Sequence, residues 1–318
     1  MIIVTGGAGF IGSNLVQALN RMGHEDIIVV DDLSDGTKFK NLVSAKIIDY
    51  LDKDDFLAKI SIDHGFGDKI EAVFHLGACS TTTEWDGRYM LQNNYEYSKI
   101  LFHYCLKRDI PFIYASSAAV YGKSTDFREI PENEKPLNVY GYSKLLFDQY
   151  LRKMAPRITI PVVGLRYFNV YGQQEQHKGA QGSVVWHFDT QFKKEHKIKL
   201  FVGSSGYADG EQRRDFIHVS DAVAINIWCW QNIKHHGLHI FNLGTGQSRS
   251  FNDVARAVLA WHKQAFDKVE YISFPDKLVD AYQSFTEADM SYLQKLKCEH
   301  KFKSLEEGVK EYLDWLNT

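Results

Sequence analysis

The chain has 318 residues, of which 44% are hydrophobic and 24% are charged, and its formal net charge is −3. This length exceeds one typical domain and predicts one large domain or two fused lobes. The small negative charge argues against nucleic acid as the main partner, and no apolar stretch is long enough to cross a membrane.

Two further features limit the classes of protein to which the chain can belong. The four cysteines, Cys79, Cys105, Cys229 and Cys298, show no CxxC spacing, so we expect reduced thiols and neither a metal site nor a disulfide framework. Met1 leads directly into a strand-like run, so we expect no signal peptide and a cytosolic location.

The first half of the chain alternates short apolar runs with helical patterns, which is typical of βαβ units and a parallel sheet. The apolar runs predict strands at residues 2–4, 27–30, 45–48, 72–76, 111–115 and 161–166. Helices are predicted at residues 10–21, at 93–108, and in a segment that carries Tyr140 and Lys144 and ends near Met154. We therefore expect an α/β fold with a doubly wound parallel Rossmann sheet over residues 1–170.

Beyond Tyr171 the pattern changes. Polar, glycine-containing stretches predict loops at 172–183 and 203–214, and such long loops are usually functional or disordered. Helices are predicted at about 183–195, 221–232, 251–265 and 304–317, and short strands at 198–202, 239–242 and 269–273. We expect a smaller mixed α/β substrate lobe over residues 171–318, packed against the first domain, with some strands and helices returning to it.

A glycine motif follows the first predicted strand. Gly6, Gly9 and Gly12 are spaced three apart and lie where the first helix begins. Glycine permits the tight turn and the close approach of a pyrophosphate, and the helix N-terminus offers N–H groups and a positive dipole end. In this context the motif predicts a dinucleotide-binding site.

The acidic residue Asp31 ends the second predicted strand, where a carboxylate binds the adenosine ribose diol of NAD. Lys38 follows shortly after Asp31, and Lys53 opens the next predicted helix. Either lysine could pair with the 2′-phosphate of NADP, or both could be solvated surface charges. The spacing alone leaves NAD and NADP both open.

Tyr140 and Lys144 lie at positions i and i+4 of one helix, so they share a face. An ammonium beside a phenol stabilises the phenolate and lowers its pKa, which makes the phenol an acid/base at neutral pH. Ser117, at the end of the fifth predicted strand, would hold the reacting hydroxyl with Tyr140. These residues predict hydride transfer between a nicotinamide and a carbon that bears a hydroxyl.

The motifs TGGAGFIG, ASSAAVYG, YGYSK and RYFNVYG together resemble the extended short-chain dehydrogenase/reductase superfamily. Within it, the chain is similar to the ADP-L-glycero-D-manno-heptose 6-epimerase family along its whole length. That narrower likeness is carried by residues 75–86 (HLGACSTTTEWD), 35–39 (DGTKF), 177–179 (HKG) and 274–277 (FPDK). This family supplies the heptose of the lipopolysaccharide inner core.

The resemblance implies tightly held NADP, with NAD less favoured, and a homo-oligomer, which is a pentamer in the family. It places Lys38 and Lys53 near the 2′-phosphate. The cofactor-binding positions that it implies are Gly6, Gly9, Phe10, Ile11, Gly12, Asp31, Asp32, Lys38, Lys53, Leu76, Gly77, Ala78, Cys79, Ser80, Asn93, Lys144 and Val170.

The implied reaction is reversible oxidation at C6 of the ADP-heptose, with a 6-keto intermediate that is reduced from its other face. Tyr140, Lys144 and Ser117 would serve the hydride transfer, and Lys178 would be the second acid/base. Without the resemblance, Lys178 reads as an exposed loop lysine. The substrate-binding positions that the resemblance implies are Asn169, Ala180, His187, Phe201, Val202, Gly203, Ser204, Arg214 and Tyr282.

Two departures from the family pattern concern the substrate. Ala180 stands where members can carry a serine, so one hydrogen bond to substrate would be lost. The stretch Ser205–Arg213 is longer than usual, which leaves Arg213 and Arg214 both open as the ligand of the diphosphate. A guanidinium suits that group because it binds phosphate oxygens in pairs, although Arg214 could instead form a structural pair with Asp215.

Three rival readings remain. A 4,6-dehydratase carries an Asp-Glu pair just after the fifth strand, where this chain has Ala118-Ala119. Another nucleotide-sugar epimerase, such as a UDP-hexose 4-epimerase, would not require Lys178. A cofactor-sensing binding protein would be expected to lose Tyr140 or Lys144, and both are present.

Overall fold

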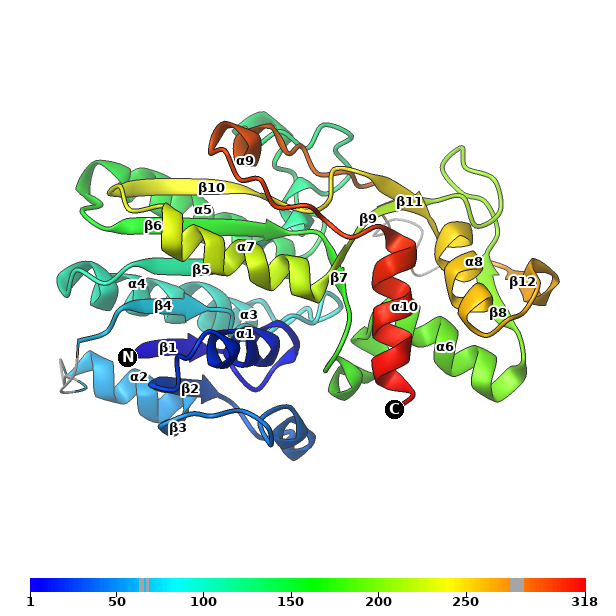
Figure 1. The fold of residues 1–318 in the computed structure, drawn as a ribbon. Coiled ribbons are helices and arrows are strands. Elements are labelled where there is room, and N and C mark those ends of the chain that lie inside the picture. The colour runs from blue at the N-terminus through cyan, green and yellow to red at the C-terminus, as the bar shows by residue number, and fades with distance from the viewer. Residues whose placement is uncertain (63–65, 67–68, 275–282) are drawn as a thin grey trace. The chain divides into compact units, whose positions relative to one another are not determined.

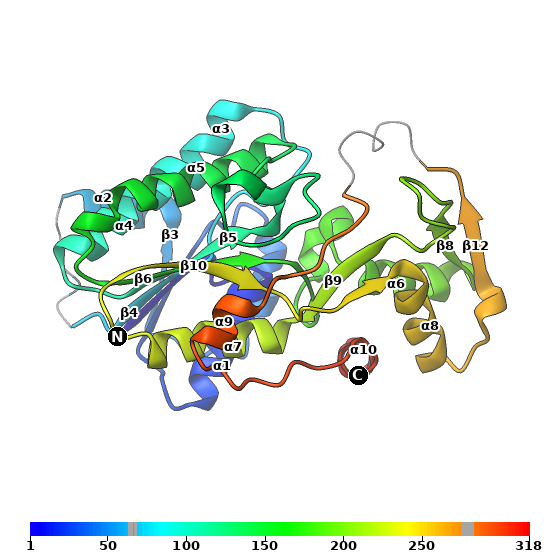
Figure 2. The same cartoon turned by 90° about the horizontal axis from the view of Figure 1, so that it is seen from above.

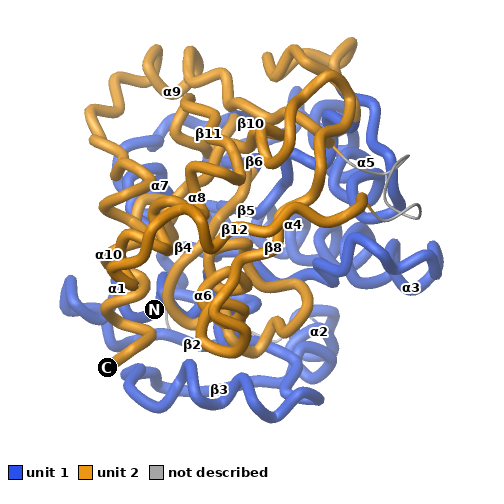
Figure 3. Tube along the Cα trace, turned by 90° about the vertical axis from the view of Figure 1, so that its right-hand side faces the viewer, with its two compact units in different colours: residues 1–122, 134–166, 223–241 blue, residues 123–133, 167–222, 242–318 orange. Residues whose placement is uncertain are grey.

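The computed structural model describes residues 1–62, 66, 69–274 and 283–318. They form two compact units, which Figure 3 shows in two colours. The first unit contains residues 1–122, 134–166 and 223–241, and the second contains residues 123–133, 167–222 and 242–318. The chain therefore passes between the units several times.

The first unit is built on a seven-stranded sheet, and its order is β10-β6-β5-β4-β1-β2-β3. The pairings of β1 with β2 and β4, of β2 with β3 and of β4 with β5 are all parallel. The strands are β1 (Ile2–Thr5), β2 (Ile27–Asp31), β3 (Asp49–Asp52), β4 (Ala72–His75), β5 (Phe112–Ser117), β6 (Pro161–Tyr167) and β10 (Gly237–Leu243).

Helices cover both faces of this sheet (Figures 1 and 2). The helices α2 (Lys53–Ser61), α4 (Tyr97–Lys107) and α5 (Val139–Met154) lie on one face. The opposite face carries α1 (Phe10–Arg21) and most of α7 (Val219–Asn232). This arrangement confirms the predicted doubly wound Rossmann fold, and β10 adds a seventh strand to the usual order.

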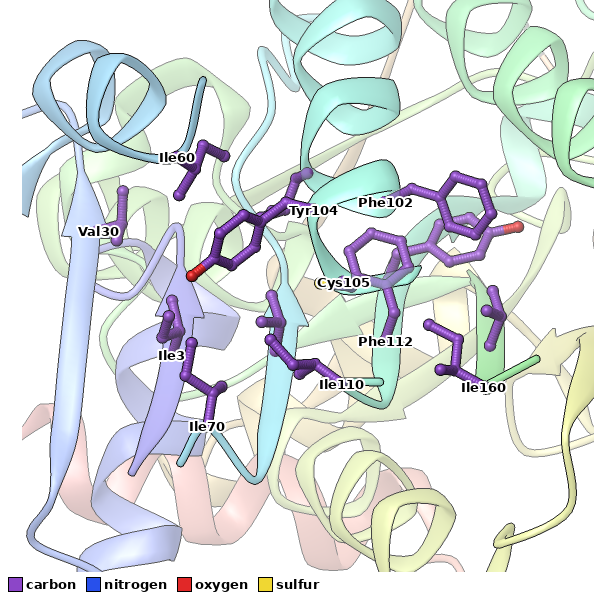
Figure 4. Close-up of a cluster of buried hydrophobic side chains, with 14 of the residues drawn as sticks. Ile3, Val30, Ile60, Ile70, Phe102, Tyr104, Cys105, Ile110, Phe112 and Ile160 are labelled. Atoms are coloured by element: carbon purple, nitrogen blue, oxygen red, sulfur yellow. The ribbon is translucent and has the colours of Figure 1, made fainter. Parts of the chain in front are cut away.

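The core of the first unit forms because both faces of the inner strands are buried, which favours continuous apolar runs. Figure 4 shows one cluster, in which Ile3 and Phe112 of the sheet lie beneath Phe102 and Cys105 of α4. Burying a large apolar side chain stabilises a fold by roughly 1.5–3 kcal/mol, so this cluster fixes α4 on the sheet.

The second unit contains two small sheets and a separate core. One sheet has the order β11-β9-β7 and the other pairs β12 with β8. The elements are β7 (Asn169–Tyr171), α6 (Val184–Glu195), β8 (Ile198–Phe201), β9 (Arg213–His218), β11 (Ser248–Ser250), α8 (Phe251–Trp261), β12 (Val269–Ile272), α9 (Ser291–Lys295) and α10 (Leu305–Leu316). Ser250 and Ser304 each form a capping box, which sets the starts of α8 and α10.

Several predicted boundaries were wrong. The third strand is Asp49–Asp52 rather than 45–48, because an edge strand is exposed on one side and needs no apolar run. The helix predicted to begin at Asn93 begins at Gly87, where the Asp86 carboxylate accepts from the N–H of Tyr89, and continues through a π-helical turn to Lys107. The helix predicted to reach residue 265 ends at Trp261.

The loop predicted over 203–214 ends earlier than expected, because strand β9 begins at Arg213. The strands β7, β9 and β11 were not predicted, since they are short and rich in polar residues. Two short helical segments precede α4: α3 at Gly87–Leu91 and a π-helical turn at Gln92–Glu96. The described residues also form 3₁₀ turns at Gly36–Asn41, Ala118–Tyr121, Pro131–Asn133, Ala155–Arg157, Gln176–Gln181 and Phe266–Lys268. Within the described residues, every helix is too short or too polar to span a membrane.

Candidate active site

The glycine turn between β1 and α1 leaves no room for side chains. Gly6 has a φ of +69°, and a Cβ there would lie 2.6 Å from the backbone N of Gly77. A Cβ on Gly12 would lie 2.0 Å from the carbonyl oxygen of Gly6. Gly9 caps α1 without a side chain, so the first-turn N–H groups can face an anionic ligand. The turn has the shape that a pyrophosphate site requires.

Gly12→Ala is expected to abolish retention of the dinucleotide, because its methyl group cannot coexist with the Gly6 carbonyl in this turn. The measurement is the amount of nicotinamide dinucleotide released from the purified, denatured protein. Gly36→Ala is the matched control, since a Cβ there meets nothing within 4 Å. Retention of cofactor by a folded Gly12→Ala protein would contradict this assignment of the turn.

The acidic end of β2 is already paired with the two lysines that the sequence singles out. Asp31 is buried, and its Oδ2 accepts from the N–H of Ala8 at 2.8 Å. Its Oδ1 accepts from Lys38 Nζ at 2.7 Å. Lys53 Nζ lies 3.1 Å from Asp32 Oδ2. Hydrogen bonds from Ser34, assisted by Lys53, lower the pKa of Asp32 to about 2. The Asp32 carboxylate is therefore ionised at neutral pH, and each of the two carboxylates pairs with a lysine.

A pocket of about 160 Å³ opens beside these pairs at the ends of β1, β2 and β4. Tyr89, Asn93 and Tyr97 are spaced by four residues and together form its helical wall. The tyrosines were not predicted, although their spacing from Asn93 would have indicated them. The predicted cofactor residues in the lining are Gly6, Asp31, Asp32, Lys38, Lys53, Gly77, Ala78, Cys79 and Asn93.

The other predicted cofactor residues do not line this pocket. Phe10, Ile11 and Gly12 form the first turn of α1, and Leu76 and Ser80 flank the lining residues after β4. Val170 belongs to β7 in the second unit.

The segment after β4 is held by two buried side chains that the sequence did not indicate. His75 bonds to Thr5 Oγ1 at 2.6 Å and to Ser98 Oγ at 2.8 Å. Burial, with the charge of Lys144, lowers its pKa to about 3, so the ring is neutral. Asn94 accepts from the N–H of Cys79 at 2.8 Å and donates to its carbonyl at 2.9 Å. These contacts fix the segment that lines the pocket.

Asn94 also donates to Ser143 Oγ at 3.0 Å, and Ser143 lies on α5 between Tyr140 and Lys144. The helix begins where Asn138 Oδ1 accepts from the N–H of Gly141 at 2.8 Å. One amide therefore joins the pocket wall to the helix that carries the predicted acid/base pair.

The structure brings Ser117, Tyr140 and Lys144 together at the end of β5. A hydrogen bond joins the side chains of Tyr140 and Ser117. Lys144 is buried, and its Nζ donates to the carbonyl oxygen of Ala115 at 2.8 Å. Strand β5 therefore contacts the phenol of Tyr140 through Ser117 and the ammonium of Lys144 through Ala115.

The pKa of Tyr140 changes in the opposite direction to the one that the sequence predicts. Burial raises the pKa of Tyr140, and the hydrogen bond with Ser117 opposes the rise without cancelling it. Burial lowers the pKa of Lys144 to about 8, although the charge of Asp148 opposes the change. Desolvation is the largest effect on both groups because each charged form loses its hydration on burial. In this structure Tyr140 is therefore a protonated phenol at neutral pH.

A buried ionic network lies behind the pair. Asp148, two turns after Tyr140, accepts from Tyr114 Oη at 2.8 Å and from Ser116 Oγ at 2.9 Å. Arg166 of β6 donates to Asp148 at 3.0 Å and also to Glu134. The network joins α5 to β5 and β6 and holds the acid/base helix on the sheet.

The second predicted acid/base, Lys178, lies in the second unit between β7 and α6. Its N–H donates to the carbonyl of Glu175 at 2.9 Å. His187 lies on α6, and its Nε2 is 3.3 Å from the carbonyl oxygen of Ala180. The loop predicted over 172–183 thus contains a 3₁₀ turn at Gln176–Gln181 and keeps His187 beside Ala180.

The remaining predicted substrate residues also lie in the second unit, except Tyr282, which falls outside the described residues, as do three residues of the 274–277 motif. Asn169 belongs to β7, and Phe201 ends β8. Gln212 Nε2 donates to the carbonyl of Val202 and to Ser204 Oγ, and the N–H of Gly203 donates to Asp209.

Arg213 and Arg214 point to opposite faces of β9, because side chains alternate along a strand. Arg213 donates to the side chain and carbonyl of Ser248. The guanidinium of Arg214 lies over the ring of Phe251, 5.8 Å from its centre. Asp215 instead accepts from Thr245, Gly246 and Ala288, so it does not serve as the ion-pair partner considered for Arg214.

Comparisons with known proteins match nearly the whole chain. The model of the NAD dependent epimerase/dehydratase family matches residues 2–244. The chain is 58% identical, over 99% of its length and 97% of the relative, to an ADP-L-glycero-D-manno-heptose-6-epimerase from Alkalilimnicola ehrlichii.

Two solved structures share the fold along nearly the whole chain. One is the ADP-L-glycero-D-manno-heptose-6-epimerase from Helicobacter pylori, with a TM-score of 0.84, 30% identity, and coverage of 99% of this chain and 96% of that one. The other is a UDP-N-acetylglucosamine 4-epimerase from Methanobrevibacter ruminantium in complex with UDP-N-acetylmuramic acid. Its TM-score is 0.83 at 26% identity, with coverage of 99% and 97%.

Proposed function

The chain belongs to the NAD dependent epimerase/dehydratase family, and we propose that it inverts C6 of ADP-D-glycero-D-manno-heptose to give the L-glycero epimer. The observation that carries this proposal is the 58% identity to a heptose 6-epimerase over 99% of the chain. The grouping of Ser117, Tyr140 and Lys144 at the end of β5 supplies the chemistry that such a reaction needs. The product would be the heptose donor for the lipopolysaccharide inner core.

The first unit fits a nicotinamide dinucleotide. The glycine turn would take the pyrophosphate, since Gly6 and Gly12 allow a tight backbone turn that an added Cβ would prevent by colliding with the backbone of Gly77 or Gly6. The pocket beside Asp31 and Lys38 would take the adenosine end. When bound, the nicotinamide would supply the hydride acceptor and donor for oxidation and re-reduction at C6.

Tyr140 is proposed to act as the phenolate, so that its Oη takes the proton of the C6 hydroxyl as the carbon is oxidised. Ser117 orients that hydroxyl, and the ammonium of Lys144 stabilises the phenolate. Reduction from the other face needs a proton donor from a second direction, and Lys178 is proposed for that role. Arg214 or Arg213 would bind the diphosphate, with Asn169, His187 and the segment 201–204 around the sugar nucleotide.

We propose NADP as the cofactor, which is supported by Lys38 and Lys53 in the pocket lining beside Asp31, since either lysine could pair with a 2′-phosphate. Lys38→Ala is expected to weaken binding of NADP by about 10- to 100-fold, since a charged hydrogen bond contributes about 1.5–3 kcal/mol. Binding of NAD should change much less, because the Asp31 carboxylate then becomes available to a ribose diol. Dissociation constants for both cofactors on the cofactor-free protein test this.

Lys40→Ala is the control for that comparison, because Lys40 is an exposed lysine of the same turn. An equal loss of NAD and NADP affinity in Lys38→Ala would show that Lys38 serves the fold of the turn rather than the phosphate.

The test of the reaction is an NMR assay with ADP-D-glycero-D-manno-heptose and no added cofactor. Conversion to the L-glycero epimer would establish both the reaction and a retained cofactor. Conversion of UDP-glucose to UDP-galactose without any turnover of the heptose would replace the proposal by a 4-epimerase. The homo-oligomer and the cytosolic location stay predictions.

A further inference from the structure

Glu175 is a buried carboxylate that bonds both ends of the loop containing Lys178. Its side chain is fully buried in the second unit. Oε1 accepts from the N–H of Gly172 at 3.3 Å and from Ser183 Oγ at 2.6 Å, and Oε2 accepts from the N–H of Ser183 at 2.5 Å. Gly172 follows the last residue of β7, and Ser183 caps α6. One carboxylate therefore ties the end of a strand to the start of a helix.

The chain between these two ends adopts conformations that need such support. Gly172, Gln174 and Gly179 have φ values of 140°, 69° and 51°. The left-handed region is unfavourable for a glutamine, so surrounding contacts must hold it. The carbonyl of Glu175 also accepts from the N–H of Lys178 at 2.9 Å. The same residue thus fixes the loop through its side chain and the turn at Lys178 through its backbone.

The charges of Glu175 and Lys178 depend on one another. Burial lowers the pKa of Lys178, and the carboxylate of Glu175 opposes this change. Burial raises the pKa of Glu175, which Ser183 and Lys178 oppose. From α10, Tyr312 faces Glu175 with a pKa raised by burial and by that carboxylate, and Asp189 of α6 adds to the effect on Tyr312. Among the described groups that act on the Lys178 ammonium, the Glu175 carboxylate is the anion that favours its charged form.

We propose that Glu175 is the positioning residue for Lys178, because its carboxylate closes the loop at Gly172 and Ser183 and its carbonyl accepts from the N–H of Lys178. This inference rests on the proposed role of Lys178 as the second acid/base. Without the carboxylate, the loop ends separate and Lys178 loses the partner that keeps it protonated when it must donate.

The experiment compares Glu175→Ala, Glu175→Gln and Lys178→Met in the full-length, cofactor-loaded protein. Three readouts are used: kcat and KM for the heptose, the pH dependence of kcat, and hydrogen exchange of peptides covering residues 172–183. The control is Glu270→Gln, which removes an exposed carboxylate that pairs with Lys197. It should leave all three readouts unchanged.

Glu175→Ala is expected to lower kcat at least tenfold, to change KM less, and to speed exchange at Gly172 and Ser183. Glu175→Gln can still accept from Ser183, so exchange should stay near that of the unmutated protein. Its pH dependence of kcat should shift to lower pH, because the ammonium of Lys178 loses the charge that holds its proton.

Two outcomes would overturn the inference while the proposed function stands: unchanged kcat and exchange in Glu175→Ala, or an unchanged pH dependence in Glu175→Gln. Full activity of Lys178→Met would instead remove the role of Lys178 itself, whatever Glu175 does. Should Glu175→Ala fail to fold, the pH dependence of Glu175→Gln decides.

Discussion

Tyr140→Phe is expected to lower the rate of epimerisation by about 10²- to 10⁴-fold while leaving the protein folded and loaded with cofactor. The phenol is the group proposed to move the proton of the reacting hydroxyl, and general acid/base catalysis contributes about that factor. The partly buried ring keeps its place in the variant, so packing on β5 changes little. The measurement is kcat for the heptose by NMR, with cofactor content determined on the same sample.

Tyr142→Phe provides a matched control for this variant. It lies on the same helix, but its side chain is 46% exposed. It should keep the unmutated rate. A Tyr140→Phe protein within about tenfold of that rate would remove Tyr140 from the mechanism and transfer the proton to another group.

Lys144, whose pKa is about 8 in this structure, is expected to contribute one alkaline step to the pH dependence of kcat/KM. Below that pH the ammonium is charged and can stabilise the phenolate of Tyr140. Above it the charge is lost, so kcat/KM should fall on the alkaline side. A rate that is flat to pH 10 would show that the ammonium of Lys144 is not required for the proton transfer.

Arg166→Met is expected to destabilise the protein by about 3–5 kcal/mol, which is the usual effect of removing one partner from a buried ionic network. Arg166 is fully buried and serves two carboxylates, Asp148 and Glu134. Its loss leaves both carboxylates without the guanidinium that compensated their burial. The free energy of unfolding in urea measures the effect.

Two further variants test the cause of that loss. Arg128→Met removes an exposed ion pair with Asp126 and should cause no measurable change. Adding Asp148→Asn to Arg166→Met should recover part of the stability, because it removes one of the uncompensated charges. An Arg166→Met protein as stable as the unmutated one would show that the network contributes specificity of packing rather than stability.

The same network gives a stability difference with pH. Burial alone would raise the pKa of Glu134, but hydrogen bonds and charges from Arg152 and Arg166 lower it below its usual value. Its ionised form is therefore favoured in the folded state. The stability that it contributes is present above its unfolded pKa and is lost as the pH falls through the lowered folded value. The free energy of unfolding of the Arg166→Met protein should therefore fall less over this acid range than that of the unmutated protein.

The sequence by itself determined the elements whose signals are local. Apolar runs such as Ile27–Val30 become buried strands, and the glycines at 6, 9 and 12 allow the dinucleotide turn, because neighbouring residues alone encode both features. The spacing of Tyr140 and Lys144 places them on one face of α5 for the same reason. These local signals were enough to predict the Rossmann sheet and the shared helix face of Tyr140 and Lys144.

The tertiary structure alone decided which partners these side chains meet. Asp31 already binds Ala8 and Lys38, burial reverses the expected change in the pKa of Tyr140, and Asn94 joins the segment after β4 to α5. The polar edge strand β3 and the short strands β7, β9 and β11 likewise depend on distant partners. Each feature arises between residues far apart in the chain, and desolvation is set only when they pack together.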